Sequence, residues 1–238
     1  MKHLSPGSAQ AAEACARHIA LTARAAVERQ GRASIALSGG STVKVLFPVL
    51  AAAALPWEHV HWFWVDERGV PPTHEQSNYR LAAELLLRPA GIPAANVHRI
   101  PAEHPPDEAA RLYAEDIRRH FALGPAALPR FDLIHLGMGP DAHTASLFPG
   151  EPLIEDRTGL TAPVWVPKFN QWRVTLLPGV IVSAHAIAFL ATGPDKAEAL
   201  RAVLEEPYQP LLYPAQIGVH GGVEPDWFLD SGAARLLR

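Results

Sequence analysis

Residues 34–42, SIALSGGST, decide the fold class of this chain. The first four residues form a short apolar run of the kind that makes a buried β-strand, and Gly39 and Gly40 follow closely. A candidate helix at residues 42–54 begins directly after this turn. A strand that passes through a glycine turn into a helix predicts an α/β protein with a mainly parallel sheet.

The same alternation of strand and helix continues along the chain. Apolar runs predict further strands at residues 60–65, 96–100, 131–136 and 186–191, and helical patterns lie at residues 12–27, 77–87, 106–121 and 195–204. Gly31 is expected to end the first helix. Proline and glycine gather in the connections without forming a long linker, so we expect one domain over residues 1–238, with helices on both faces of its sheet.

Composition argues against several functional classes. The 238 residues carry 21 basic and 24 acidic side chains, and this balance leaves no basic stripe for nucleic acid or an anionic membrane. An anionic ligand would have to be held by local cations and backbone amides. Cys15, the single cysteine, lies on an apolar helix face, and the N-terminus resembles neither a signal peptide nor a spanning segment. We therefore expect a cytoplasmic protein without a disulfide.

In an open parallel sheet, ligands bind beyond the carboxyl ends of the strands, and the first such segment is glycine-rich. It consists of Ser38, Gly39, Gly40, Ser41 and Thr42. The two glycines allow close approach of a ligand, and free amides at a helix N-terminus favour phosphate. A tight turn with an N-cap explains the same residues equally well. The segment is not a Walker A loop, because no Gly-Lys-Ser/Thr follows.

A second polar segment follows the strand at residues 60–65. Asp66, Glu67 and Arg68 stand there, and together they could hold a polar substrate, with Arg68 suited to bidentate binding of phosphate. Three charges at a strand end could also simply be solvated. Downstream, Ser77 is explained as a helix N-cap, whereas Asn78 has no obvious structural role.

The third segment, GMGPDAHTASLFPG at residues 137–150, is the most informative. Its glycines, Gly139 among them, satisfy a loose dinucleotide-binding pattern, but Pro140 removes an amide from the loop and no acidic residue ends a second strand. A histidine beyond a glycine loop can instead be a general base, and Asp141 stands two residues before His143. The segment favours catalysis by His143, with the role of Asp141 left open.

The fourth segment, TGPDK at residues 192–196, follows the predicted strand at residues 186–191 and adds a cation to the candidate anion pocket. Lys196 falls in the first turn of a helix, where the helix dipole disfavours a positive charge and calls for a compensating anion. Asp195 or a substrate phosphate could supply it. Lys168 and Arg173 are the other cations considered for the phosphate, and the sequence leaves the choice between them open.

The remaining histidines do not predict a metal site. No metal-binding pattern such as His-Glu-x-x-His, and no carboxylate–histidine cluster at ligand spacing, accompanies them, so structural roles are expected for His59, His61, His74, His98 and His104. There is also no Gly-x-Ser-x-Gly elbow for a nucleophilic serine.

Taken together and in order, these four segments resemble the 6-phosphogluconolactonase family across nearly the whole chain. The resemblance implies a Rossmann-like fold, shared with glucosamine-6-phosphate isomerases, and hydrolysis of 6-phosphoglucono-δ-lactone. It further implies His143 as general base, a phosphosugar lactone as the partner, and neither a metal ion nor another cofactor. Two positions depart from the family pattern, which has glycine in place of Ala142 and proline in place of Val43. A positive φ at Ala142 would cost about 1 kcal/mol.

Two alternatives to the lactonase remain. A glucosamine-6-phosphate deaminase would share the phosphate loop and the histidine, but its pattern resembles Asp-Glu-Tyr where this chain has Arg68, and Gly-His-Ile-Ala-Phe where it has His143-Thr144-Ala145-Ser146. A sugar-phosphate sensor without turnover would usually carry a DNA-binding segment, for which we see no room. The oligomeric state does not follow from the sequence.

Overall fold

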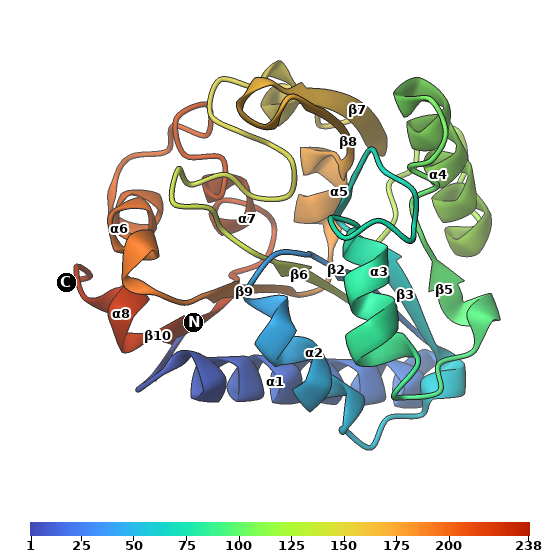
Figure 1. The fold of residues 1–238 in the computed structure, drawn as a ribbon, viewed down its shortest axis with the longest axis horizontal. Coiled ribbons are helices and arrows are strands. Elements are labelled where there is room, and N and C mark those ends of the chain that lie inside the picture. Colours follow the sequence, from blue (N-terminus) through green and yellow to red (C-terminus); the bar gives the residue numbers. More distant parts are fainter.

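The computed structural model describes residues 1–238 and contains two β-sheets (Figure 1). The larger sheet is parallel throughout, in the order β1 (Lys2–Ser5), β10 (Asp226–Asp230), β9 (Ile187–Ala191), β6 (Leu133–Leu136), β2 (Ala33–Leu37), β3 (Val60–Trp64) and β5 (Val97–His98). The smaller sheet is antiparallel, in the order β4 (Asp66–Arg68), β8 (Gln171–Leu176) and β7 (Thr161–Val166).

Helices cover both faces of the larger sheet, which is the arrangement a fully parallel sheet requires. The helices are α1 (Ser8–Gln30), α2 (Val43–Ala51), α3 (Asn78–Ala82), α4 (Pro106–Phe121), α5 (Pro178–Ser183), α6 (Ala197–Glu205), α7 (Gln216–Val219) and α8 (Ser231–Ala234). Single turns are η1 (Trp57–His59), the π-helical η2 (Ala83–Leu87), η3 (Ala94–Asn96), η4 (Pro152–Glu155), η5 (Pro167–Phe169) and η6 (Pro194–Lys196). Figure 1 shows α1 and α2 on one face, and α4, α5 and the smaller sheet on the other.

The order of the strands determines where a ligand can bind. From β2 the chain proceeds through β3 to β5 on one side of the sheet, then returns to β6 and continues through β9 to β10 on the other side. Strands β2 and β6 are neighbours, but the connections that leave their carboxyl ends run to opposite sides of the sheet. Such a switch point leaves a crevice beyond the strand ends, and ligands of open α/β sheets bind there.

The core forms because the central strands are apolar on both sides. Every residue of β2, β6 and β9 is buried, and one cluster of 61 buried hydrophobic side chains extends through the sheet and its helices. Helix α1 contributes a face of alanines together with Cys15, and burial raises the pKa of this thiol. Gly31 ends α1 in the left-handed conformation with φ 79°, as predicted.

The predicted α/β class with a mainly parallel sheet is confirmed, and each predicted strand and helix has a counterpart. Several bounds were wrong. The strand at residues 96–100 is only Val97–His98, and the strand at 131–136 begins at Leu133. The helix at 12–27 extends over Ser8–Gln30, the helix at 77–87 divides into α3 and η2, and the helix at 42–54 ends at Ala51. The prediction also missed β1, β10 and the smaller sheet. No helix combines the length and the apolar character needed to cross a bilayer.

Candidate active site

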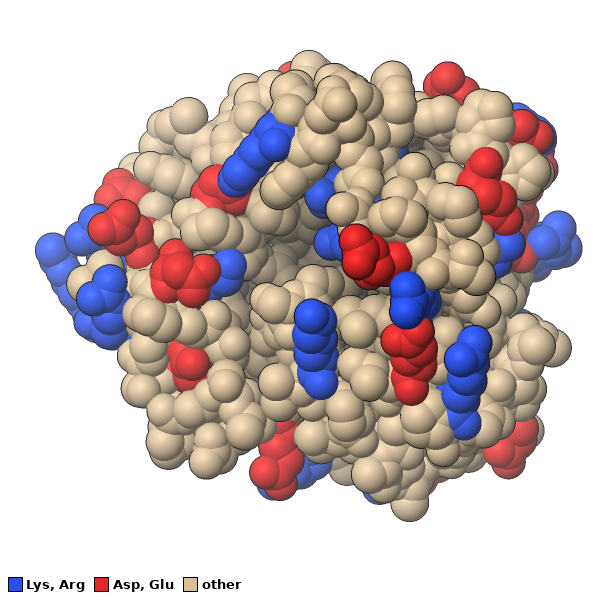
Figure 2. Space-filling view, viewed as in Figure 1, with Lys and Arg blue, Asp and Glu red and all other residues tan.

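A pocket of about 180 Å³ opens at the carboxyl ends of β2, β3, β6 and β9. Figure 2 shows Lys and Arg side chains within and around a hollow in the middle of this face. Most of the predicted site residues line the pocket, namely Ser38, Gly39, Gly40, Ser41, Thr42, Asp66, Arg68, Gly139, His143, Arg173 and Lys196. Two predicted residues, Asp141 and Asn78, do not line it and instead contact residues that do. The four segments are thus brought to one place.

The glycine-rich loop forms one wall of the pocket. None of the backbone amides of residues 39–42 donates to another protein atom, so these amides are free to bind an anion in front of helix α2. The Ser38 hydroxyl accepts a hydrogen bond from the amide of Gly137 at 3.3 Å and joins the loops after β2 and β6. A Cβ atom on Gly39 would lie 1.7 Å from Oδ1 of Asn78. The role of Asn78 therefore includes packing against a glycine that has no room for a side chain.

A buried polar network lies behind this loop. Asn78 donates to the backbone oxygen of Asp66 at 2.9 Å, and the hydroxyl of Ser146 donates to the carboxylate of Asp66 at 2.6 Å. Nη1 of Arg173 lies 4.0 Å from the same carboxylate. Burial lowers the pKa of Arg173, and Asp66 opposes that shift. Ser146 was not predicted, although a serine between the apolar residues Ala145 and Leu147 was a possible signal of a buried hydrogen bond.

Glu67 has a different role from the one considered in the sequence. Its carboxylate is buried and accepts hydrogen bonds from the amides of Arg68, Asn78 and Tyr79 and from the hydroxyl of Ser77. Burial raises the pKa of Glu67, and these four donors partly offset the shift. The carboxylate does not line the pocket. It instead fastens the loop that carries Arg68, while Ser77 caps α3 as predicted.

Arg68 reaches the pocket from the end of β4. Nη1 donates to the backbone oxygen of Gln76 at 2.7 Å, which fixes one side of the guanidinium group. Nε is buried and has no partner within the protein. A buried donor without a partner is costly, so the fold leaves this part of the guanidinium group unpaired at a cost in stability.

The loop after β6 presents His143 to the pocket. Asp141 accepts a hydrogen bond from Nδ1 of His143 at 2.5 Å and lies 3.3 Å from the backbone amide of the same residue. The Nδ1 bond holds the pKa of Asp141 well below its ordinary value. A Cβ atom on Gly139 would lie 2.0 Å from Nδ1 of His143, so this close approach requires glycine. Ala142 has a φ of 62°, so the cost considered for a positive φ at this position applies.

Aromatic side chains pack near His143 and Arg173. The ring of Phe148 stacks on His143 with centroids 4.2 Å apart. The guanidinium carbon of Arg173 lies 5.6 Å from the Phe148 ring and 4.8 Å from the Phe169 ring. Neither phenylalanine was predicted as a site residue. Their stacking fixes the plane of the imidazole and the position of the nearby buried cation.

The two lysines of the site differ in position. Lys196, at the end of η6, lines the pocket and also pairs with Asp195 at 3.0 Å. Lys168 is exposed, does not line the pocket, and pairs with Asp141 at 3.1 Å. Of the two cations left open by the sequence, Arg173 is therefore the one at the pocket. Both of the anions considered for Lys196 remain compatible with its position.

Comparison with known families identifies the chain. The family model described as glucosamine-6-phosphate isomerases/6-phosphogluconolactonase matches residues 6–225. The chain belongs to this family. Because the glucosamine-6-phosphate isomerase/6-phosphogluconolactonase family contains two activities, membership by itself does not choose between them.

The names of individual relatives point to one of the two activities. The chain is 39% identical to 6-phosphogluconolactonase of Synechocystis sp. over 90% of its length and 88% of that protein. It is 41% identical to the human 6-phosphogluconolactonase over 87% of its length and 82% of that protein. The structure is also similar to that of 6-phosphogluconolactonase from Thermotoga maritima, with a TM-score of 0.84 and 29% identity, over 97% of this chain and 99% of that one.

Proposed function

We propose that this protein is a 6-phosphogluconolactonase, which hydrolyses 6-phospho-D-glucono-1,5-lactone to 6-phospho-D-gluconate in the oxidative pentose phosphate pathway. The observation that carries the proposal is a histidine held at Nδ1 by a carboxylate, in a pocket that also contains Arg68, Arg173 and Lys196. The first group suits proton transfer and the cations suit a phosphorylated substrate. The names of the similar proteins from cyanobacteria and mammals agree with this activity.

The proposed chemistry starts from neutral His143. Asp141 holds the proton on Nδ1, so the lone pair of Nε2 is available to take a proton from water. The water oxygen attacks C1 of the lactone while His143 takes its proton. The tetrahedral intermediate then collapses, the bond between C1 and the ring oxygen breaks, and His143 returns the proton to that oxygen. The products are a carboxylic acid and a free hydroxyl, without a covalent enzyme intermediate.

The phosphate group would be bound away from the reacting carbon. Arg68, Lys196 and the free amides of residues 39–42 supply the donors in this part of the proposal. Binding energy from the phosphate positions the lactone for attack, so that a remote contact contributes to the rate. We further place the enzyme in the cytoplasm, where its single buried cysteine is compatible with a reducing environment.

The rival activity within the family is the isomerisation and deamination of glucosamine 6-phosphate. Arg68 lines the pocket at the position where that pattern resembles tyrosine. Ser146, also different from the deaminase pattern, is bound to Asp66. Arg68 lines the pocket, and Ser146 holds the carboxylate of Asp66, which also lines it; both contacts favour the lactonase over the deaminase.

The proposal is tested by generating the lactone with glucose-6-phosphate dehydrogenase and following formation of 6-phosphogluconate above spontaneous hydrolysis. Wild-type protein should accelerate the reaction, and His143→Ala should lose the acceleration. His59→Ala, at an exposed histidine of η1, is the matched control and should keep it. Absence of acceleration by the wild type would exclude the lactonase, and turnover of glucosamine 6-phosphate would support the rival.

A further inference from the structure

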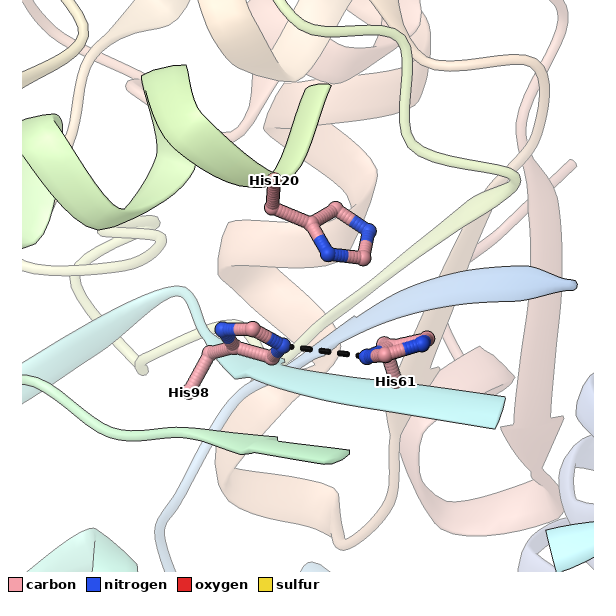
Figure 3. A group of neighbouring side chains, drawn as sticks. All are labelled: His61, His98 and His120. Carbon is pink, nitrogen blue, oxygen red and sulfur yellow. Dashed lines mark hydrogen bonds between the residues drawn. The ribbon is translucent and has the colours of Figure 1, made fainter. Parts of the chain in front are cut away.

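Three imidazoles meet at the amino-terminal half of β3, at the other end of the strand from the catalytic pocket. His61 is the second residue of β3, His98 ends the neighbouring strand β5, and His120 lies in the last turn of α4 (Figure 3). Reasoning from sequence assigned structural roles to His61 and His98 and did not consider His120. The three residues come from separate elements, so no spacing motif could have revealed the group.

The ring nitrogens lie at distances close to those of a metal site. Nδ1 of His61 and Nε2 of His98 are 3.1 Å apart, and each of the three residues offers a nitrogen within 4.8 Å of the others. Two imidazole nitrogens bound tetrahedrally at about 2.0–2.1 Å from zinc are roughly 3.3 Å apart. The first pair is already near this separation, and Figure 3 shows His120 facing the pair. His120 would supply the third nitrogen to an ion bound by the pair.

The opposite nitrogens of two rings are already bound by polar groups. Nδ1 of His98 lies 2.8 Å from a carboxylate oxygen of Asp116, and Nε2 of His120 lies 2.8 Å from the hydroxyl of Ser34. Histidines that bind metals usually donate their other N–H to a carboxylate or another oxygen, which fixes the ring and its tautomer. With Nδ1 of His98 donating to Asp116, Nε2 of His98 accepts a hydrogen bond from Nδ1 of His61, and a metal ion would replace this bond as the proton of His61 moves to its Nε2. Ser34 leaves Nδ1 of His120 for the ion.

Burial keeps two of these rings uncharged. It lowers the pKa of His61 to about 4 and that of His120 to about 3, and repulsion from the neighbouring histidines and Arg32 acts in the same direction. At neutral pH both rings therefore present lone pairs, as a metal ion requires. Arg32 disfavours a cation at this place, whereas the carboxylate of Asp116 favours one.

We propose that His61, His98 and His120 form a binding site for a divalent transition-metal ion such as Zn²⁺, with water as the remaining ligand. Imidazole is a ligand that suits zinc, copper and nickel, whereas magnesium and calcium prefer oxygen. The ion would join the edge strand β5 and the end of α4 to β3. Its role is to stabilise this part of the fold, because the residues that line the catalytic pocket follow the carboxyl ends of the strands.

Binding is measured on chain without a polyhistidine tag, by calorimetric titration with Zn²⁺ and by the visible spectrum of bound Co²⁺. We expect one ion per chain and a tetrahedral Co²⁺ spectrum. At a free Zn²⁺ concentration about 100 times Kd, the melting temperature should rise by about 5–10 °C. His61→Gln and His120→Gln should each weaken binding at least about 100-fold. Asp116→Asn should weaken it about 10-fold, because the amide holds the proton on Nδ1 of His98 less strongly than the carboxylate does.

Two controls keep the result interpretable. His104→Gln changes a half-exposed histidine outside the group and should leave the affinity for Zn²⁺ unchanged. Lactone hydrolysis by each variant reports that the fold is intact, since none of these residues lines the pocket. The proposal is overturned if folded wild-type protein binds no Zn²⁺ saturably, or if His61→Gln and His120→Gln bind it as tightly as the wild type. In either case the three rings are a hydrogen-bonded cluster only.

Discussion

Nδ1 of His143 lies 2.5 Å from Oδ1 of Asp141, two residues earlier in the same loop. The same oxygen accepts a hydrogen bond from the backbone amide of His143 at 3.3 Å, so one carboxylate contacts both the ring and the backbone of His143. The carboxylate of Asp141 can therefore orient the imidazole of His143 and support the turn at the same time. This short pair is the relationship on which the proposed base depends.

Asp141→Asn should reduce kcat by about 10²–10⁴-fold with little change in KM. An amide that donates to Nδ1 stabilises the tautomer with the proton on Nε2, and that tautomer cannot accept a proton from water. The measurement is the initial rate of lactone hydrolysis at saturating substrate. Asp107→Asn, in the first turn of α4, is the control and should retain the wild-type rate. A wild-type kcat for Asp141→Asn would contradict the proposed role.

Asp141 should also contribute to the acid sensitivity of the fold. Its pKa is lowered in the folded protein, chiefly by the hydrogen bond from His143, so its contribution is present above its ordinary pKa of about 3.9 and is lost as the pH falls below it. Urea unfolding between about pH 5 and pH 3 should therefore show a steeper loss of stability for wild type than for Asp141→Asn. Parallel curves of stability against pH for the two proteins would argue against a stabilising hydrogen bond between Asp141 and His143.

Lys196→Met should raise KM by about 10–100-fold with a smaller effect on kcat. Its ammonium group lines the pocket, and loss of a charged hydrogen bond to phosphate costs roughly 1.5–3 kcal/mol. Lys168→Met is the matched control, because this exposed lysine pairs only with Asp141, and an exposed ion pair is worth at most about 1 kcal/mol. Steady-state kinetics should separate the two variants. Equal effects on KM would contradict the proposal that Lys196 binds the phosphate and Lys168 does not.

Gly139→Ala should reduce kcat by about 100-fold, because the new methyl group would lie 2.0 Å from His143 and 2.5 Å from the Asp141 carboxylate. The ring must move to make room, and a displacement of about 1 Å is sufficient for such a loss. Gly124→Ala, where a Cβ would meet nothing within 4 Å, provides the control. Unchanged kinetics for Gly139→Ala would show that the loop accommodates the methyl group.

Ala142→Gly should stabilise the protein, since alanine is strained at a φ of 62° and glycine is not. We expect a gain of about 0.5–1 kcal/mol, which corresponds to about 1–4 °C in melting temperature. Ala114→Gly, inside helix α4, should have the opposite sign because glycine is unfavourable in a helix. Thermal unfolding measures both, and a lower melting temperature for Ala142→Gly would contradict the strain at this position.

The predictable part of the site consisted of segments in which local chemistry is visible in the chain. The loop at residues 38–42 and the His143 loop each follow a buried strand, and parallel strands place their carboxyl ends at one edge. Ser146 and Phe148 were missed because their contacts are with Asp66 and with the ring of His143. Short strands such as β4 and β1 were also missed, because their pairing partners, β8 and β10, are far away in sequence.

The amino-acid sequence predicts the α/β class and most of the residues that line the pocket, because strand periodicity, glycine turns and charged strand ends are local properties. The family follows from the resemblance of the four segments to 6-phosphogluconolactonases. The packing of distant elements, by contrast, places Arg173 at the pocket and Lys168 outside it, and lets Glu67 fasten a loop. It also brought His61, His98 and His120 together. These outcomes depend on which distant elements pack against each other, and that choice is made by burial of the shared core.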